Sequence, residues 1–207
     1  MALRLYCATS NPGKLLEFQQ AASDGIEIHG LPPVHCPETG DTFEQNAVSK
    51  ALCYSEALKG APNVSPLVFA DDSGLVVNAL EGAPGIHSAR FAGPDADHAA
   101  NNSLLLEKLS AVPRDRRTAS FVCCIALSRG ERVIQTFQAE VHGMILGEQR
   151  GSGGFGYDPL FYLPELGRTF AELTPDQKWL HSHRGRAFEQ LLARLRETEE
   201  GGSTAGL

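Results

Sequence analysis

The chain has 207 residues, of which 42% are hydrophobic and 21% are charged, and its formal net charge is −7 at pH 7. These values are ordinary for a globular protein, and the length is sufficient for one sizeable hydrophobic core. The negative net charge argues against sequence-independent binding to a nucleic-acid backbone. No apolar run approaches the roughly 18 residues needed to cross a bilayer, and the N-terminal apolar stretch is too short for a signal peptide. We therefore expect a cytoplasmic protein without nucleic-acid or membrane partners.

The cysteines form neither a C-x-x-C pair nor a zinc-site spacing. They are Cys7, Cys36, Cys53, Cys123 and Cys124. Three of them, Cys7, Cys123 and Cys124, lie in predicted strands, where a reduced buried thiol behaves as a small hydrophobic group. This usage favours core packing over redox or metal chemistry.

The first third of the chain predicts one strand and two helices. Hydrophobic residues alternate with others at 3–7, which is typical of a strand. A polar turn follows, and a helix is predicted from 14 to about 23. Thr42 and Gln45 have the spacing of a capping box, so we expect them to open a second helix that ends near Gly60.

The rest of the chain predicts strands and helices in mixed order. The expected strands are 67–70 and 75–80 on either side of a turn at 71–74, then 119–128, 133–141 and 160–163. The expected helices are 99–109, a region opened by Thr174 and Pro175, and a last helix with Phe188, Leu191, Leu192 and Leu195 on one face. Because strict βαβ alternation is absent, we predict an α/β fold with a mixed sheet flanked by helices. One domain is expected at 1–196, followed by a disordered tail at 197–207.

The turn TSNPGK lies between the first predicted strand and the first predicted helix. Backbone N–H groups and the positive end of a helix dipole at such a turn suit a phosphate, and Lys14 adds a compact cation. The turn lacks the glycine pattern of a Walker A loop. The alternative is an ordinary capped turn with a surface lysine.

A glycine-rich loop, GSGGFGYDP, occupies 151–159. It matches G-x-G-x-x-G, but no helix is predicted to follow it, which argues against dinucleotide binding. Phe155 has a face that can stack on a flat base, and Asp158 can accept hydrogen bonds from ring N–H groups. The alternative is a hairpin loop with Phe155 packed into the core.

The segment KWLHSHRGR at 178–186 gathers positive charge in an otherwise acidic chain. Such a cluster suits a polyanion, and His183 and Arg184 carry donors that can bind carbonyl oxygens. The alternative is a solvated helix start.

Two adjacent carboxylates, Asp71 and Asp72, stand in the otherwise apolar run VFADDSGLVV. A carboxylate at a strand end is a good ligand for Mg²⁺, and it can orient or deprotonate a water for attack on phosphorus. Alternatively, both acids cap a turn closed by Ser73 and Gly74. Because neighbouring strand residues point to opposite faces, we expect one acid to be structural and the other to face the site.

Taken together, these stretches resemble the inosine triphosphate pyrophosphatase family. The resemblance extends from Ala8 to Arg184 and is carried by TSNPGK, ETGDTFEQNAVSKA, FADDSGL, EGAPGIHSARFAG, GGFGYDPLF, and AELTPDQK followed by SHR. It implies Mg²⁺-dependent hydrolysis of ITP, dITP and XTP to the monophosphate and pyrophosphate. It also implies an elongated mixed sheet, two lobes with an active-site cleft between them, and a homodimer.

The resemblance implies roles for particular residues. Asp72 is expected to be the catalytic acid and a metal ligand, with Glu38 the second metal ligand. This leaves Asp71 as the acid that the strand alternation predicts to be structural, in the turn. Lys50 is expected to support the phosphate side, and Ser73 to contact substrate. The other residues expected to bind substrate are Thr9, Ser10, Asn11, Pro12, Gly13 and Lys14 around the triphosphate, Phe155, Gly156, Tyr157 and Asp158 around the base, Lys178 in the phosphate or base region, and His183 and Arg184 at the purine 6-oxo group.

One departure from the family pattern lies on the second predicted helix. The family often has Glu-Asn-Ala there, whereas this chain has Gln45-Asn46-Ala47, with Glu44 displaced by one position. Two other functions stay open: a pyrophosphatase for other modified nucleotides, and a non-enzymatic nucleotide-binding module.

Overall fold

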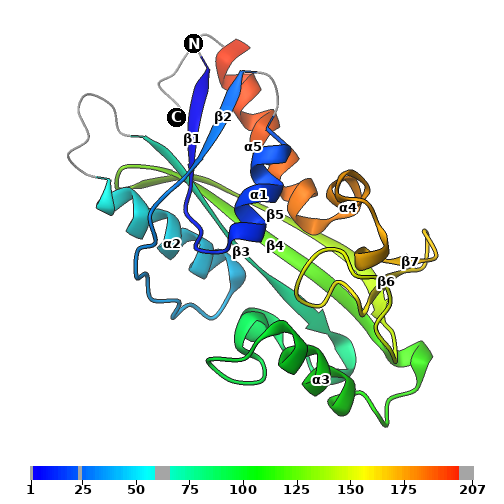
Figure 1. Cartoon of the computed structure of the whole chain (residues 1–207). Helices are drawn as coiled ribbons and strands as arrows, with labels where there is room; N and C mark the ends of the chain where they lie inside the picture. Colours follow the sequence, from blue (N-terminus) through cyan, green and yellow to red (C-terminus); the bar gives the residue numbers. More distant parts are fainter. Residues whose placement is uncertain (1, 23–24, 59–65, 201–207) are drawn as a thin grey trace. The chain divides into compact units, whose positions relative to one another are not determined.

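The computed structural model of the chain describes residues 2–22, 25–58 and 66–200 (Figure 1). The strands are β1 (Leu3–Cys7), β2 (Ile26–Gly30), β3 (Leu67–Val77), β4 (Thr118–Arg129), β5 (Arg132–Ile145), β6 (Phe161–Leu163) and β7 (Arg168–Thr169). The α-helices are α1 (Pro12–Gln20), α2 (Phe43–Ala57), α3 (His98–Lys108), α4 (Pro175–His181) and α5 (His183–Glu200). None of these described helices has the length and hydropathy that crossing a membrane requires.

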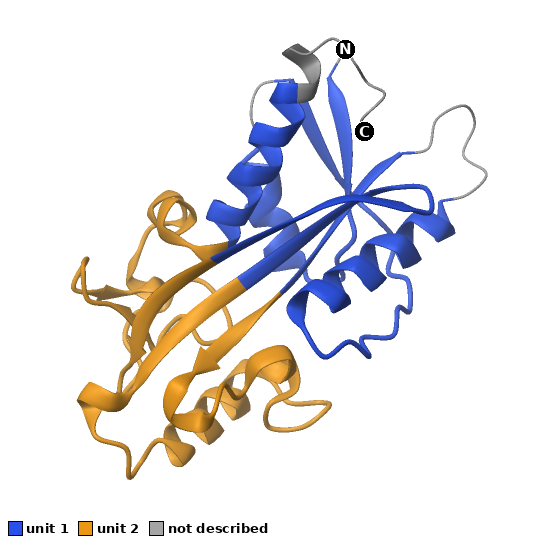
Figure 2. Cartoon of the chain, turned by 180° about the vertical axis from the view of Figure 1, so that it is seen from behind, with its two compact units in different colours: residues 1–72, 123–139, 184–207 blue, residues 73–122, 140–183 orange. Residues whose placement is uncertain are grey.

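The seven strands form one mixed sheet in the order β2-β1-β3-β4-β5-β6-β7, with helices flanking it, which confirms the predicted fold class. β1 pairs in parallel with β2 and β3, and β6 pairs antiparallel with β5 and β7. The chain divides into two compact units, coloured separately in Figure 2. Unit 1 comprises residues 1–72, 123–139 and 184–207, and unit 2 comprises 73–122 and 140–183. β3, β4 and β5 each contribute residues to both units.

Unit 1 has helices on both faces of β3 (Figure 1). On one face, Phe69 packs with Phe18 of α1 and Phe188 of α5, with ring centroids 5.0 and 5.6 Å away. On the other face, Val68 packs in a cluster with Ala47 and other residues of α2. Alternate residues of β3 therefore face different helices, as the pleat of a strand requires.

Unit 2 has its own hydrophobic core. Its fully buried members include Leu75 at the end of β3, Leu105 of α3, and the aromatic residues Phe161 and Phe170. Phe121 of β4 lies 4.5 Å from Phe161, centroid to centroid, so aromatic rings pack against one another within this largely aliphatic core.

Side-chain caps fix the helix starts. Asn11 caps α1, its side chain accepting hydrogen bonds from the N–H groups of Gly13 and Lys14. Thr42 caps α2 through the Gln45 N–H, as predicted. The predicted start of α4 at Thr174 is also confirmed.

The structure corrects several sequence expectations. The predicted turn at 71–74 is wrong, because β3 runs unbroken through these residues and the two acids do not cap a turn. β2 was not predicted, since only two apolar residues alternate in it. α1 spans Pro12–Gln20 rather than 14–23. α5 continues to Glu200, so the predicted tail at 197–207 begins inside this helix, and its residues 201–207 lie outside the described part of the chain.

The cysteines divide into two groups. Cys7, Cys123 and Cys124 are buried and free, as predicted, and burial is the main cause that raises the pKa of each thiol. Cys36 and Cys53 instead form a disulfide with a Cα–Cα distance of 6.0 Å. The expectation of core packing is therefore wrong for this pair, which no sequence motif marks.

Candidate functional site

A charged cluster surrounds Asp71 in unit 1. Its carboxylate oxygen Oδ2 lies 2.7 Å from Lys14 Nζ and 3.6 Å from Arg184 Nε. Arg184 also forms an ion pair with Glu17 of α1, NH1 to Oε2 at 2.6 Å. Asp71 and Arg184 are both almost fully buried. These ion pairs fix α1 and α5 to the same strand.

The electrostatics of this first cluster favour the charged forms. Burial alone would raise the pKa of Asp71, but the positive charges of Lys14, Arg184 and Lys50 outweigh it and hold that pKa well below its usual range. Burial likewise opposes the charge of Arg184, yet Glu17 and Asp71 raise its pKa. Asp71 is therefore ionised at any ordinary pH. Its structural role lies in these ion pairs and not in the turn that the sequence predicted.

The carboxylate of Asp72 meets a different set of residues, those of α2. Its Oδ2 accepts a hydrogen bond from Asn46 Nδ2 at 3.2 Å, and its Oδ1 lies 3.9 Å from Lys50 Nζ. The Lys50 ammonium in turn lies 2.7 Å from Glu38 Oε1 and donates to the backbone carbonyl of Asp71. Two carboxylates thus converge on one cation.

Burial raises the pKa of Asp72 to about 6, and the negative charges of Asp71 and Glu38 act in the same direction. The positive charges of Lys50 and Lys14 lower it only in part. The pKa of Lys50 is itself raised, because these carboxylates outweigh the effect of its burial. Asp72 is therefore poised to exchange a proton near neutral pH, as a general base must.

The loop that carries Glu38 is held to α2 by side chains of the helix. Asn46 Oδ1 accepts a hydrogen bond from the Gly40 N–H at 2.9 Å, and Gln45 Oε1 accepts one from the Asp41 N–H at 2.7 Å. A Cβ at position 40 would lie only 2.6 Å from the Gln45 side chain, which explains the glycine. Asn46 therefore binds this loop with one side-chain atom and Asp72 with the other.

The predicted phosphate turn is shaped by its own hydrogen bonds. Asn11 occupies the N–H groups of Gly13 and Lys14, and Thr9 Oγ1 accepts from the Asn11 N–H at 3.2 Å. Ser10 and Pro12 are exposed. The turn thus offers Lys14 and exposed side chains, while two of its N–H groups already have an acceptor.

A second cluster lies in the glycine loop of unit 2. Asp158 Oδ2 accepts a hydrogen bond from the Phe155 N–H at 2.8 Å and lies 2.7 Å from Lys178 Nζ. The same ammonium lies 4.5 Å from the centroid of the Phe155 ring, a cation–π contact. Gly154 has φ +70°, and a Cβ there would clash with the Asp158 carboxylate. The loop is thus folded around Asp158, and Phe155 is half-buried rather than part of the core cluster.

Two other predicted site residues of unit 2, Tyr157 and His183, have rings that pack against neighbouring side chains. The Tyr157 ring is buried in the core, and its hydroxyl donates to the Ser88 carbonyl oxygen. The His183 ring stacks on Phe121, with centroids 4.7 Å apart and planes 6° apart. Gly156 accepts a hydrogen bond from Asn102 through its carbonyl oxygen. Ser73 lies within β3 and is half-buried.

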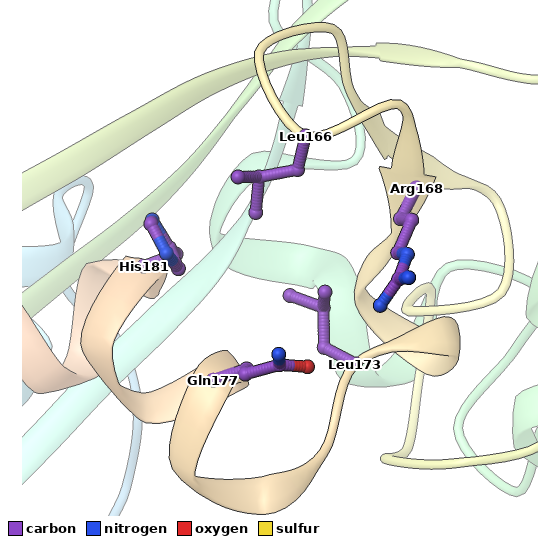
Figure 3. Close-up of a pocket in the computed structure, with 5 residues that line it drawn as sticks. All are labelled: Leu166, Arg168, Leu173, Gln177 and His181. Atoms are coloured by element: carbon purple, nitrogen blue, oxygen red, sulfur yellow. The ribbon is translucent and has the colours of Figure 1, made fainter.

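A pocket with a volume of about 290 Å³ lies elsewhere in unit 2 (Figure 3). It is lined by Leu166, Arg168, Leu173, Gln177 and His181. His181, whose role the sequence left open, therefore faces this pocket, which contains none of the predicted site residues.

Two residues of the charged clusters were missed by sequence reasoning. Glu17 binds Arg184 although 167 positions separate them, and no motif marks it. Asn46 had a signal, because it stands in the Gln45-Asn46-Ala47 triplet that matches the Glu-Asn-Ala of the family pattern at its second and third positions. Glu44 instead accepts a hydrogen bond from Thr136.

Comparison with known proteins shows similarity over nearly the whole chain. The Ham1 family profile matches residues 5–194. A protein of Exiguobacterium sibiricum named dITP/XTP pyrophosphatase is 46% identical over 198 residues, covering 93% of this chain and 97% of that protein. The solved Ham1 protein of Coxiella burnetii has a TM-score of 0.81 and 40% identity, covering 94% of this chain and 99% of that one. For the Staphylococcus aureus Ham1 protein, the TM-score is 0.80 and the identity 39%, covering 94% and 98%.

These similarities confirm the resemblance that the motifs indicated, and they extend over both units. The family profile spans both the charged cluster of unit 1 and the glycine loop of unit 2. The solved Ham1 protein of Coxiella burnetii shares the fold at 40% identity. The chain belongs to the Ham1 family.

Proposed function

We propose that this chain hydrolyses dITP, XTP and ITP to the nucleoside monophosphate and pyrophosphate. Membership of the Ham1 family and the identity to a relative named dITP/XTP pyrophosphatase support the proposal. The observation that carries it is the pair of acids on β3: Asp71 holds the cations of unit 1 in place, and Asp72 has the raised pKa of a general base. A cytoplasmic homodimer is part of the proposal, as the sequence predicted.

Mg²⁺ is the cofactor that we propose, and the donor set fits it. Asp72 and Glu38 already hold one cation, the Lys50 ammonium, between their oxygens. Within the described residues, no group of three or more His, Cys, Asp or Glu side chains converges as a metal site would require. Mg²⁺ commonly binds through one or two carboxylates together with substrate phosphates, so two carboxylates are sufficient. Once bound, Mg²⁺ would neutralise charge on the phosphate oxygens as a Lewis acid.

The chemical step proposed for Asp72 is proton removal from water. The water oxygen forms a bond to the α-phosphorus as the bond from that phosphorus to the bridging oxygen breaks. Asp72 takes the proton of the water, and pyrophosphate leaves with the electron pair of the broken bond. Lys14 and Lys50 would stabilise the negative charge of the phosphates, so that catalysis rests mainly on positioning and electrostatics.

We propose that the glycine loop of unit 2 binds the base. Asp158 fixes the Phe155 backbone and the Lys178 ammonium, which orients one aromatic face and one donor. Hypoxanthine and xanthine carry a 6-oxo acceptor where adenine has an amino group. A donor that meets the amino group instead is left unpaired, a mismatch of about 1–3 kcal/mol per buried group. We propose Arg184 and His183 as the donors to the 6-oxo group, as the sequence predicted. Glu17 and Asp71 already form ion pairs with the Arg184 guanidinium.

The test is the rate of pyrophosphate release from a panel of nucleotides with and without Mg²⁺. We expect kcat/KM for dITP, XTP and ITP to exceed that for ATP and GTP, with no turnover in EDTA. A preference for dUTP or methylated nucleotides would favour the rival pyrophosphatase. Nucleotide binding without any pyrophosphate release would identify a binding module and overturn the proposal.

A further inference from the structure

The Cys36–Cys53 disulfide lies beside the catalytic cluster proposed for unit 1. It joins the loop that precedes α2 to a residue inside that helix. Between the two cysteines lie Glu38, Asn46 and Lys50, which are the residues that contact Asp72 directly or through Lys50. The bond thus closes a segment that carries all of these contacts.

The loop at 31–42 has neither helical nor strand structure. Three of its backbone N–H groups donate to side chains of α2: the Val34 N–H donates to the Tyr54 hydroxyl, and the Gly40 and Asp41 N–H groups donate to Asn46 and Gln45. Side-chain contacts of this kind open more easily than a helix or sheet ladder. A covalent bond to α2 therefore has a large effect on where Glu38 lies.

The two bonded cysteines are also the accessible ones. Cys36 and Cys53 are half-buried, whereas Cys7, Cys123 and Cys124 are buried. Disulfides in reducing compartments are mostly transient and redox-sensing. In the cytoplasm that the sequence predicts, a half-exposed pair of this kind would form and break rather than persist.

We propose that Cys36 and Cys53 are a reversible redox modification site that sets the metal affinity of the proposed pyrophosphatase. The disulfide holds Glu38 against Lys50, where it can serve as a metal ligand. Reduction by a dithiol breaks the S–S bond: two electrons and two protons convert it to two thiols, and the dithiol becomes a cyclic disulfide. Oxidation by a low-molecular-weight disulfide reverses the step and releases two equivalents of its thiol. This inference rests on the proposed function.

The first measurement follows the bond itself in the full chain. Protein treated with dithiothreitol or with oxidised glutathione is alkylated with N-ethylmaleimide, and the modified cysteines are located by peptide mass. We expect Cys36 and Cys53 to be alkylated only after reduction, while the three buried cysteines stay unmodified under both conditions. Alkylation of both residues in the oxidised sample would show that no bond forms, which overturns the proposal.

The second measurement follows the loop without any substrate. We expect amide hydrogen exchange at Val34, Gly40 and Asp41 to be faster in the reduced protein, and the Tm to be lower by about 5 °C or more. Equal exchange in both redox states would contradict the release of the loop. This readout decides that point even if no nucleotide is hydrolysed, in which case the proposed function fails by itself.

The third measurement is the Mg²⁺ dependence of dITP hydrolysis. On reduction we expect the Mg²⁺ concentration for half-maximal rate to rise about tenfold, the effect of releasing a metal-site residue, with little change of kcat at saturating Mg²⁺. The Cys36→Ser/Cys53→Ser double variant is the matched control. Its Mg²⁺ requirement should equal that of the reduced protein and should not change when dithiothreitol is added. If reduction changes the Tm but not the Mg²⁺ requirement, the bond is a structural disulfide only. This result would overturn the proposal.

Discussion

Asp71 and Asp72 follow one another in β3, but their carboxylates contact different helices. Asp71 Oδ2 lies 2.7 Å from Lys14 of α1, on the face that α5 also covers. Asp72 Oδ2 instead accepts a hydrogen bond from Asn46 of α2, 3.2 Å away. The pKa of Asp71 is held low by its cations, whereas burial raises the pKa of Asp72 to about 6. The Asp71 carboxylate is therefore held in ion pairs with α1 and α5. The Asp72 carboxylate has a pKa at which it can accept a proton near neutral pH.

Replacing Asp71 by Asn should destabilise the protein. The change leaves Arg184 and Lys14 close together without the carboxylate that neutralises them, and breaking a buried ion pair in this way costs about 3–5 kcal/mol. We expect a lower denaturant midpoint in chemical unfolding. Asp95→Asn is the control, since this aspartate is exposed, and it should change the midpoint little. Equal midpoints for the two variants would mean that the Asp71 ion pairs are not structural.

Replacing Asp72 by Asn should remove activity without loss of stability. A general base contributes about 10²- to 10⁴-fold, so kcat should fall by at least a hundredfold while dITP still binds. The folded pKa of about 6 lies above the ordinary value of 3.8, so the stability linked to this group is present below pH 3.8 and lost as the pH rises through 6. The neutral variant escapes that loss, and at pH 8 its free energy of unfolding should exceed the wild-type value by up to about 3 kcal/mol.

Turnover kinetics, calorimetric nucleotide binding and urea unfolding at pH 8 test these three expectations. A near wild-type kcat would exclude Asp72 as the base. A variant that loses both stability and activity would instead point to a structural role like that of Asp71.

The pH dependence of kcat/KM should report Asp72 in the free enzyme. We expect kcat/KM for dITP to fall below pH about 6, because the base must be ionised to accept a proton. Lys50 lowers the pKa of Asp72, so the Lys50→Met variant should lose activity at a higher pH than the wild type, whatever its maximal rate. If kcat/KM falls at the same acidic pH in both proteins, the group that must be ionised is not Asp72.

Glu38 should affect the metal requirement, and Glu44 should not. Glu38 reaches Lys50 at 2.7 Å beside Asp72, whereas Glu44 accepts a hydrogen bond from Thr136. We expect Glu38→Gln to raise the Mg²⁺ concentration for half-maximal rate by about 10- to 100-fold. Glu44→Gln is the matched control on the same segment. Steady-state rates measured over a Mg²⁺ titration compare the two variants. If only Glu44→Gln changes the Mg²⁺ requirement, Glu44 and not Glu38 is the metal ligand.

Asp158 should act through the residues that it positions. An asparagine keeps one acceptor oxygen for the Phe155 N–H, but it leaves the nearly buried Lys178 without this counter-charge. We therefore expect Asp158→Asn to raise KM for dITP and XTP while kcat changes less, since the affected contacts are those proposed for the base. A fall in kcat at unchanged KM would contradict a role in base binding.

Local pattern predicted much of the fold. Each of the following predictions depends on neighbours in the sequence and was confirmed: the strand at β1, the capped starts of α2 and α4, the successive strands β4 and β5, and the apolar face of α5. The sequence does not predict β2, because this strand is short and carries only two alternating apolar residues. The turn predicted at 71–74 failed because two adjacent acids and a glycine are typical of turns, and only ion pairs with distant cations allow them to remain in a strand.

The sequence by itself determined the family, the α/β class and the identity of the residues that carry charge and aromatic faces, because these are properties of composition and of short ordered motifs. Only the tertiary structure decided how those residues are paired. Lys14 and Arg184 are far from Asp71 in the chain yet both pair with it, and Cys36 bonds to Cys53 in the segment that carries Lys50. The physical reason is that an ion pair, a pKa and a disulfide depend on distance and burial in space, which the folded sheet and its helices set and the order of residues does not display.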